Sequence, residues 1–334
     1  MLASLEQIHS LAPIGGADRI ECGKVLSWPV VVEKSKYKNG DEVVFIQPDT
    51  TVPRAPWNQF LWPKKDLDPN GGRIRLRCCK FKGQPSMGLV VSPQFLSRKF
   101  EIGEDVSEDL GIEKWEMPLD LGNGQTKGNF PAWLRKSDEH NVLSCPRAFY
   151  EIQRRSCSIT VKMDGSSAKF SLKDGAFQVF SRRLETVHDG GNSWSFAATK
   201  YNLESKLREL GRNLALCGEL CGPKLNGNKM GLKEPEFYLY DVWDIDNQVY
   251  LDYHLVEILS EQLEIPSVPL WKPVDVFRYE SIVELQTEID KCKYRNEEWI
   301  EGVVVRPIYE TYSPALKGRL SWKLINTNFA AKHL

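Results

Sequence analysis

The segment Ser158-Ile159-Thr160-Val161-Lys162-Met163-Asp164-Gly165 joins a β-favouring run to a Lys-x-Asp-Gly tetrapeptide. A lysine amine at the end of a strand can attack the α-phosphorus of a nucleotide once its surroundings favour its neutral form. Asp164 can hold a metal ion beside that amine, and Gly165 lets the backbone approach a phosphate closely. Asp-Gly is also a common turn pair, so the tetrapeptide taken alone favours an ordinary surface hairpin.

The composition is that of a globular protein without a dominant charge. The chain has 334 residues, of which 41% are hydrophobic and 27% charged, and its net charge is -1. This length predicts two domains. Because the overall charge is close to zero, a nucleic-acid-binding surface would have to be a local patch.

The usual signals for a membrane segment, a disulfide framework and a zinc site are missing from the sequence. No apolar stretch approaches the length of a transmembrane helix, and the N-terminal residues do not follow the signal-peptide pattern. The eight cysteines form no Cys-x-x-Cys pair, and the five histidines are scattered. We therefore expect reduced thiols, no zinc, no membrane partner, and a monomeric protein that is intracellular and cytoplasmic.

Residues 1–115 contain short β-strand patterns separated by turn residues, which predicts a small barrel. The expected strands are residues 5–11, 24–32 (a pair interrupted at Pro29), 43–46, 73–77 and 87–91. Residues 116–130 are polar, with Gly and Pro spread through them, and predict a linker.

Residues 131–334 mix strand and helix patterns, which predicts an α+β domain with antiparallel sheets. The expected strands are residues 157–161, 168–172, 177–180, 215–220, 237–242, 302–305 and 320–325. The expected helices are residues 194–210, 255–263 and 282–292.

Five further segments place reactive side chains near expected strands. Arg182 can bind a phosphate through two parallel hydrogen bonds, Glu219 can accept a hydrogen bond from a ribose hydroxyl, and Tyr240 can stack on a base. Glu301 heads an apolar strand, a costly place for a carboxylate that binds nothing, and Lys323 can contact an α-phosphate. Each segment alone is also explained by a solvated strand end, a turn or a core aromatic side chain.

In this order the six segments resemble the signature motifs of the covalent nucleotidyltransferase superfamily, which contains ATP-dependent polynucleotide ligases and capping guanylyltransferases. The resemblance covers about residues 130 to 328. The matching residues are Lys162 in Lys-x-Asp-Gly, Arg182 in Ser-Arg, Glu219 in Gly-Glu-Leu, Tyr240 with Asp241, Glu301 in Glu-Gly, and Lys323.

The order of the domains indicates which members of this superfamily the chain resembles most. DNA ligases and capping enzymes carry an OB barrel after the last lysine motif, whereas here the barrel pattern precedes the core and resembles the OB-fold of tRNA-binding-like domains. The chain is similar to the Deinococcus- and Naegleria-type RNA ligase family, and residues 135–139 resemble a Lys-Thr-Asp-Glu segment of RNA ligases. The implied fold is α+β, an OB-like barrel followed by an antiparallel-sheet, ATP-grasp-like nucleotidyltransferase domain.

The resemblance implies an ATP-dependent RNA ligase that uses Mg²⁺ or Mn²⁺ on nicked duplexes or broken RNA ends. Lys162 would form lysyl-AMP, AMP would pass to an RNA 5′-phosphate, and the 3′-hydroxyl would then displace AMP. The implied nucleotide contacts are Thr160, Lys162, Arg182, Glu219 (ribose), Tyr240 (adenine), Glu301 and Lys323 (α-phosphate). The implied metal region contains Asp164, Asp241 and Glu301, and Arg182 would also hold the phosphate of the RNA end.

The chain departs from the family pattern at two positions. Ser321 stands where many RNA ligases have the first lysine of Lys-x-Lys, and Arg319 or Lys317 are candidates to supply that charge. Val161 stands where many have a glutamate before the nucleophile, so Thr160 or backbone groups would have to contact adenine.

A basic patch is predicted in the N-terminal domain, where alternating arginines share one strand face and are spaced like successive phosphate contacts. The patch contains Arg73, Arg75, Arg77, Lys80 and Lys82, with Phe81 available to stack on a base. The alternative is a solvated strand face without a ligand. For the whole chain, the alternatives are a catalytically inactive RNA-binding protein and a DNA ligase or capping-type enzyme.

Overall fold

The computed structural model describes residues 1–62, 72–115, 126–187 and 191–333. Contacts divide the chain into two compact units, residues 1–118 with 327–334 and residues 119–326. Each unit has its own hydrophobic core. Most of the predicted linker at residues 116–130 lies outside the described residues, and the domain limits inferred from the sequence stay a prediction.

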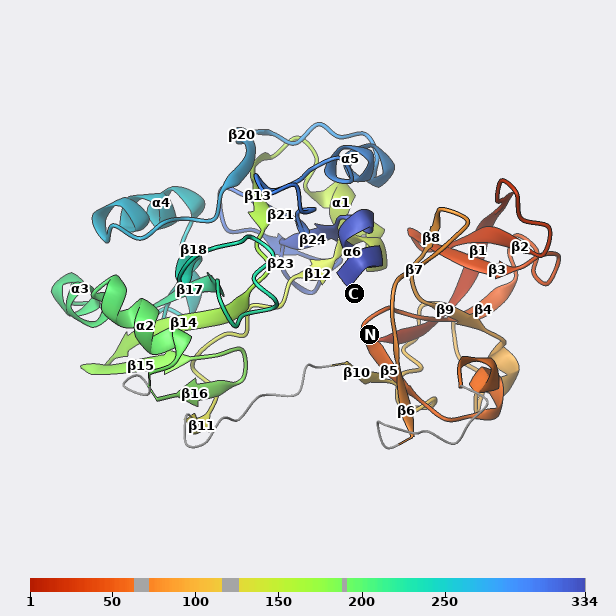
Figure 1. The fold of residues 1–334 in the computed structure, drawn as a ribbon, viewed down its shortest axis with the longest axis horizontal. Coiled ribbons are helices and arrows are strands. Elements are labelled where there is room, and N and C mark those ends of the chain that lie inside the picture. The colour runs from red at the N-terminus through yellow and green to blue at the C-terminus, as the bar shows by residue number, and fades with distance from the viewer. Residues whose placement is uncertain (63–71, 116–125, 188–190, 334) are drawn as a thin grey trace. The chain divides into compact units, whose positions relative to one another are not determined.

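The first unit is built around a nearly closed antiparallel barrel (Figure 1). Its strands form a five-stranded sheet in the order β3-β2-β1-β4-β9, a three-stranded sheet in the order β10-β5-β6, and the β7-β8 hairpin. The strands are β1 (Ala3–Pro13), β2 (Ile20–Val25), β3 (Trp28–Glu33), β4 (Glu42–Ile46), β5 (Thr50–Pro53), β6 (Arg73–Leu76), β7 (Cys79–Phe81), β8 (Gln84–Ser86), β9 (Leu89–Val91) and β10 (Glu113–Lys114). Two 3₁₀ turns, η1 (Pro56–Leu61) and η2 (Pro93–Phe95), complete it.

The long strand β1 holds this barrel together because it pairs with both β2 and β4. A register shift between Ile8 and Ser10 interrupts the β1–β2 ladder, and such a bulge bends a strand. Each strand predicted in this unit overlaps an observed strand. The predicted pair over residues 24–32 corresponds to β2 and β3, but the chain turns at residues 26–27 and Pro29 lies inside β3. Arg77 lies just beyond the end of β6.

The second unit contains a seven-stranded sheet in the order β11-β16-β15-β14-β17-β18-β19 and a five-stranded sheet in the order β12-β24-β21-β13-β20. In the described strands of these sheets, β12 is parallel to β24 and the remaining neighbours are antiparallel. The strands are β11 (Thr126–Asn129), β12 (His140–Asn141), β13 (Ser156–Lys162), β14 (Ser166–Lys173), β15 (Ala176–Phe180), β16 (Leu184–Thr186), β17 (Leu214–Cys221), β18 (Glu236–Asp244), β19 (Val249–Tyr250), β20 (Leu270–Val276), β21 (Gly302–Pro307) and β24 (Trp322–Ile325). A short hairpin joins β22 (Tyr312–Ser313) to β23 (Gly318–Arg319).

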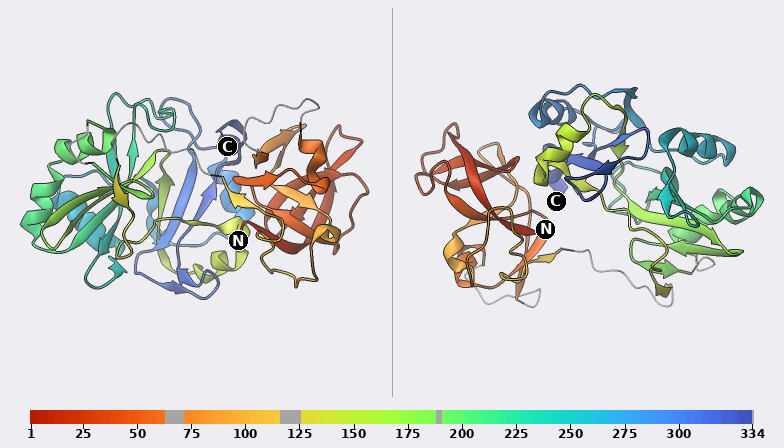
Figure 2. Two further views of the ribbon diagram at one scale, coloured as in Figure 1. Left: turned by 90° about the horizontal axis from the view of Figure 1, so that it is seen from below. Right: turned by 180° about the vertical axis from the view of Figure 1, so that it is seen from behind.

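Three helices, α2, α3 and α4, lie beside the seven-stranded sheet (Figure 2). They share a hydrophobic core with its strands. In that core Ala197, Leu207 and Val256 from the helices join Phe170 and Phe237 from the strands. The helices are α1 (Pro146–Glu151), α2 (Ser193–Lys200), α3 (Leu203–Leu210), α4 (Tyr253–Gln262), α5 (Ile282–Ile289) and α6 (Thr327–His333), with the 3₁₀ turn η3 (Val142–Ser144) before α1. No helix among the described residues is long and apolar enough to cross a membrane.

The prediction of one helix over residues 194–210 is wrong. Helix α2 ends at Lys200, and Asn202, the residue before α3, adopts a left-handed conformation with φ of 50° that separates the two helices. Asn tolerates this conformation better than most residues, and the helical spacing of apolar residues on both sides concealed the break. Strand β20 was not predicted, because Pro273 and exposed positions interrupt its pattern.

Candidate active site

Lys162 and Glu301 meet because their strands pair. Lys162 is the last residue of β13 and pairs with Gly302, the first residue of β21, so Glu301 lies beside it. The Nζ atom of Lys162 is 2.6 Å from Oε1 of Glu301, and the two side chains are 23% and 12% exposed. The predicted nucleophile thus faces a carboxylate in a partly desolvated position.

Two more carboxylates act on this lysine. Burial lowers the pKa of Lys162, but Glu301, Glu219 and Asp164 together raise that pKa above its ordinary value. Burial raises the pKa of Glu219 to about 7, with Glu301 and Asp164 adding to the shift and Lys162 opposing it. The amine is therefore held as an ammonium ion among three carboxylates.

These acidic groups fit a hard divalent cation in their chemistry. Carboxylate oxygens are ligands that Mg²⁺ and Mn²⁺ accept, and a bound cation would stabilise their charged forms. Within the described ranges, no three acidic, His or Cys side chains are placed to hold an ion by themselves. An ion here would have to complete its coordination with water and phosphate oxygens, as Mg²⁺ commonly does at nucleotide sites.

The loop after β17 contributes contacts to Asp164 that the sequence did not reveal. The Nζ atom of Lys229 is 2.5 Å from Oδ2 of Asp164. The side-chain amide of Asn226 donates to Oδ1 of Asp164 at 3.4 Å and also to the carbonyl oxygen of Gly165. Residues 226–228 have left-handed backbones, which Asn and Gly favour. The Asn-Gly-Asn run therefore indicated a tight loop, but it did not indicate which side chain the loop contacts.

Thr160 and Tyr240 line one pocket between the two sheets of the second unit. Thr160 lies on β13 and Tyr240 on β18. The hydroxyl of Thr160 donates to the carbonyl oxygen of Val304 at 3.5 Å. The guanidinium of Arg306 lies 5.6 Å from the centre of the Tyr240 ring. The structure thus brings the two predicted base contacts to the same hollow.

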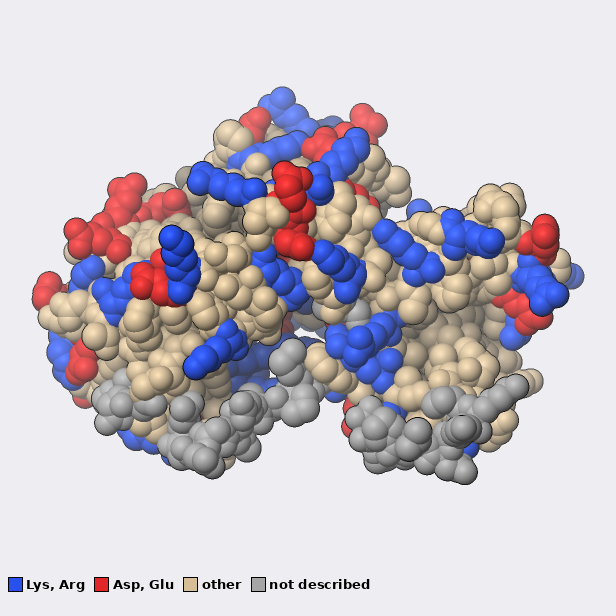
Figure 3. Space-filling view, in the orientation of Figure 1, with Lys and Arg blue, Asp and Glu red and all other residues tan. Residues whose placement is uncertain are grey.

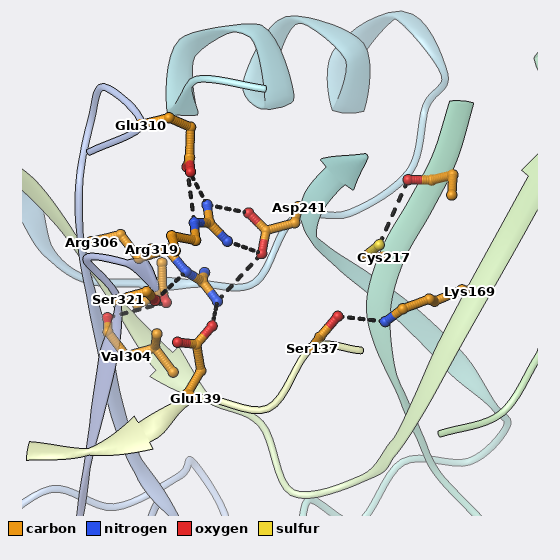
Figure 4. A network of polar contacts seen from close by, with 12 residues as sticks. Ser137, Glu139, Lys169, Cys217, Asp241, Val304, Arg306, Glu310, Arg319 and Ser321 are labelled. Carbon is orange, nitrogen blue, oxygen red and sulfur yellow. Dashed lines mark hydrogen bonds and ion pairs between the residues drawn. The ribbon is translucent and has the colours of Figure 1, made fainter. Parts of the chain in front are cut away.

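Asp241 lies in an ion-pair network on the wall of this pocket (Figure 4). Its two carboxylate oxygens are 2.7 and 2.8 Å from the Nη atoms of Arg319, and Arg306 is 3.5 Å away. Arg306 also pairs with Glu139 at 2.7 Å, and Arg319 pairs with Glu310. Because two guanidinium groups already neutralise its carboxylate, these surroundings do not favour the metal role predicted for Asp241. Arg319 was a candidate to supply the positive charge of the lysine that Ser321 replaces, and it is paired with Asp241 and Glu310 instead.

Lys323 and Arg182 occupy different places in the second unit. Lys323 lies on β24 opposite Val304 of β21. Burial raises the pKa of Glu301, and the charge of Lys323 is among those that oppose the shift, so Lys323 is electrostatically coupled to the Lys162–Glu301 pair. Arg182 follows β15, and its Nη2 atom is 2.6 Å from Oδ1 of Asp138, with both side chains about half exposed.

Two of the arginines predicted to bind RNA have partners inside the first unit. Arg73 donates to the carbonyl oxygen of Gly111 at 2.6 Å. Arg75 pairs with Asp49 at 2.5 Å, and its guanidinium lies 3.4 Å from the centre of the Trp115 ring. The strict alternation that placed these arginines on one strand face did not reveal such partners.

The other side chains of the predicted patch are exposed. Arg77 follows β6, and Lys80 and Lys82 belong to the β7-β8 hairpin or its turn, where Phe81 is 44% exposed. Figure 3 shows Lys and Arg side chains over this part of the first unit, whereas its visible Asp and Glu side chains gather elsewhere. The exposed part of the basic patch is therefore Arg77, Lys80 and Lys82.

Two family models match this chain, one in each of its two parts. A model described as RNA ligase matches residues 155–325, which contain Lys162, Glu219, Glu301 and Lys323. An OB-fold domain model matches residues 2–93. The α+β fold with an N-terminal OB domain, expected from the sequence, is thereby confirmed. The comparison with curated proteins gives no match.

Solved structures of a Naegleria gruberi RNA ligase are similar to this chain over its whole length. The ligase with PPi has a TM-score of 0.86 and 31% identity, covering 99% of this chain and 98% of that chain. A lysine-to-alanine variant with ATP and Mn has a TM-score of 0.88 and 30% identity, covering 100% and 99%. A lysine-to-methionine variant with AMP and Mn has a TM-score of 0.87 and 30% identity, covering 99% and 98%.

Proposed function

The chain belongs to the RNA ligase family, and from this premise we propose that it joins an RNA 3′-hydroxyl to a 5′-phosphate through lysyl-AMP. The observation that carries the proposal is the Lys162 amine, 2.6 Å from Glu301 and subject to the charges of Glu219 and Asp164. The Naegleria structures with ATP or AMP and Mn support ATP as the nucleotide and Mg²⁺ or Mn²⁺ as the metal.

The proposed reaction has three steps at phosphorus. The neutral Lys162 amine attacks the α-phosphorus of ATP, an N–P bond forms, the bond to the β-phosphate oxygen breaks, and pyrophosphate and a proton leave. An oxygen of the RNA 5′-phosphate then attacks the same phosphorus, which breaks the N–P bond and returns the amine. Finally the RNA 3′-hydroxyl attacks the 5′-phosphate phosphorus, loses its proton, and displaces AMP.

The side chains around Lys162 have separate tasks in this proposal. Glu301 orients the amine, Glu219 binds a ribose hydroxyl, and Lys323 contacts the α-phosphate, where negative charge develops. A divalent cation bound near Asp164 and Glu301 would neutralise phosphate charge and lower the pKa of Lys162.

Two contacts lie beyond this group. Tyr240 stacks on the adenine through its aromatic ring. Arg182 binds the phosphate of the RNA end, for which its planar guanidinium is well shaped.

We also propose that the protein works as a monomer in the cytoplasm on nicked duplexes or broken RNA ends. The spacing of the eight cysteines, which form no Cys-x-x-Cys pair, supports a reducing compartment. The exposed basic side chains Arg77, Lys80 and Lys82 would bind the RNA backbone.

A ligation panel tests the proposed function. Nicked duplexes and single strands that carry ribose or deoxyribose on either side of the break are incubated with ATP and Mn²⁺, and joined product is measured. We expect product wherever the 3′-hydroxyl strand is RNA, and none with Lys162→Ala. Joining of DNA ends alone would indicate a DNA ligase. Binding of RNA without joining of any substrate would indicate a catalytically inactive RNA-binding protein.

A further inference from the structure

Three consecutive residues, Ser137, Asp138 and Glu139, each contact a basic side chain from a different strand region. Ser137 Oγ accepts a hydrogen bond from Lys169 of β14, a lysine that is 1% exposed. Asp138 Oδ1 is 2.6 Å from Arg182, after β15, and Glu139 Oε1 is 2.7 Å from Arg306 of β21. Through Lys169 and Arg182 the first two residues contact the region of the seven-stranded sheet, and through Arg306 the third contacts the five-stranded sheet. Figure 4 shows the contacts of Ser137 and Glu139.

The segment is anchored to both sheets by the residues on either side of it. Before it, the carbonyl oxygen of Trp133 accepts a hydrogen bond from Trp243 of β18 at 3.1 Å, and the Trp133 ring packs edge-on against Phe180 of β15. After it, β12 pairs with β24, and Asn141 lies opposite Lys323. A segment held in this way has few conformations available, so its side chains can fix the groups that they contact.

Glu139 acts on the nucleotide side of the site. Its partner Arg306 donates to Ser321 at 3.0 Å and lies 5.6 Å from the ring of Tyr240. The Arg306 and Glu139 side chains are only 9% and 15% exposed, so their pairing is strongly favoured over separation. Burial alone would raise the pKa of Glu139, but Arg306 and Arg319 lower it to about 2. The carboxylate is therefore charged at every pH at which an enzyme of this kind would be assayed.

Asp138 acts on the side of the site that meets the RNA end. Its pair with Arg182 is exposed, and pairs of this kind contribute little to stability. The contact can still restrict the direction of a guanidinium that has many rotamers. A change at Asp138 is therefore expected to leave the fold intact and to alter what Arg182 binds.

We propose that segment 137–139 is a positioning element that serves both halves of the reaction separately. Glu139, through Arg306, fixes Tyr240 against the nucleotide base, and Asp138, through Arg182, fixes the guanidinium that meets the RNA 5′-phosphate. Neither residue touches a substrate. The inference rests on the proposed function for the roles of Tyr240 and Arg182.

Two assays on the full chain separate the halves of the reaction. The first measures transfer of labelled AMP from ATP to the protein over a range of ATP concentrations, and the second measures sealing of RNA whose 5′ end already carries AMP. For Glu139→Gln we expect the KM for ATP to rise roughly tenfold or more, because a displaced stacking group weakens binding, with a much smaller change in sealing. For Asp138→Asn we expect unchanged AMP transfer to the protein and roughly two- to fivefold slower sealing.

Matched variants show whether each residue acts through its partner. Glu204→Gln is the control for Asp138, because the Glu204–Arg208 pair has the same 2.6 Å separation and similar exposure, and it should change neither assay. In an Arg182→Ala background, Asp138→Asn should have no further effect on sealing. Glu139→Asp keeps the charge with a shorter reach, so it should raise the KM for ATP less than Glu139→Gln, and it replaces that variant if the latter does not fold.

The loss of activity of each variant in each assay shows whether segment 137–139 positions Arg306 and Arg182 separately. Equal losses in both assays for both variants would mean a purely structural role and would overturn it, as would no loss in either assay. A further loss from Asp138→Asn in the Arg182→Ala background would also overturn it. If the unmodified protein neither accepts AMP nor seals RNA, the proposed function itself fails, which is a different result from activity without the predicted split.

Discussion

At the scale of single residues, the chemistry depends on the charge of Lys162. Its carboxylate neighbours raise its pKa against the effect of burial, so the isolated protein holds the amine in its unreactive, protonated form. The same carboxylates are suitable ligands for a divalent cation, which would reverse their effect on the amine. Nucleotide transfer should therefore require metal for the nucleophile as well as for the phosphate charge.

The Glu139–Arg306 pair gives a pH-dependent prediction. The pKa of Glu139 is lowered from 4.5 to about 2 in the folded protein, so its contribution to stability is complete above the unfolded value and is lost as the pH falls toward 2. We expect Glu139→Gln to reduce the free energy of unfolding by about 3 kcal/mol, with a constant difference from pH 8 to about 5 and a smaller one at lower pH. Urea denaturation at several pH values measures this difference. A difference that grows below pH 5 would contradict the assignment.

Single residues also show how far the sequence could predict the site. The resemblance to the nucleotidyltransferase motifs grouped Lys162, Glu219 and Glu301. In the structure, strand pairing places Glu301 beside Lys162, and Glu219 lies close enough to raise the pKa of Lys162. The resemblance could not predict that Asp241 would be neutralised by Arg306 and Arg319, since the partners are distant in sequence and arginine gives no periodic signal.

At the scale of elements, strand β17 positions Glu219 through close contact with β18. The register between the two strands shifts at Cys217 and Gly218, immediately before Glu219. A Cβ atom at Gly218 would clash with the Phe237 ring and with the carbonyl oxygen of Tyr238. The glycine is therefore required for the approach of these strands, whereas in the sequence it was only one residue of the Gly-Glu-Leu motif.

Gly218→Ala tests this contact. Because the clash involves a buried ring and backbone, we expect the substitution to lower the free energy of unfolding by about 1–3 kcal/mol and to slow AMP transfer to the protein by displacing Glu219. Gly15→Ala is the matched control, since a Cβ there meets nothing within 4 Å, and it should change neither quantity. Equal stability of the two variants would show that β17 and β18 do not approach as closely as described.

At the scale of the whole molecule, the proposed function requires an RNA surface in addition to the catalytic unit. The net charge of -1 gives no indication of such a surface. The alternating arginines correctly indicated a strand. They did not indicate which of these side chains are available to bind RNA, because Arg73 and Arg75 have partners inside the unit. Side-chain partners of this kind depend on the closed barrel and are not visible in a local pattern.

Replacement of Arg77, Lys80 and Lys82 by alanine tests the exposed patch. If each contacts a phosphate, RNA affinity should fall and the slope of log affinity against log salt should decrease in magnitude by about 2. In the control variant, Lys34, Lys38 and Lys99 are replaced by alanine. These lysines are exposed in the same unit, and their replacement removes the same amount of positive charge. Equal effects of the two triple variants would indicate a general charge effect and no specific patch.

The proposed reaction requires a covalent bond between Lys162 and AMP. The measurement is incubation of the protein with ATP labelled at the α-phosphate and Mn²⁺, followed by denaturing electrophoresis, with labelled GTP in parallel. We predict that ATP labels the unmodified protein, that GTP does not, and that Lys162→Ala takes up no label. Absence of label from ATP, or label that persists in Lys162→Ala, would contradict the account, and label from GTP alone would indicate capping chemistry.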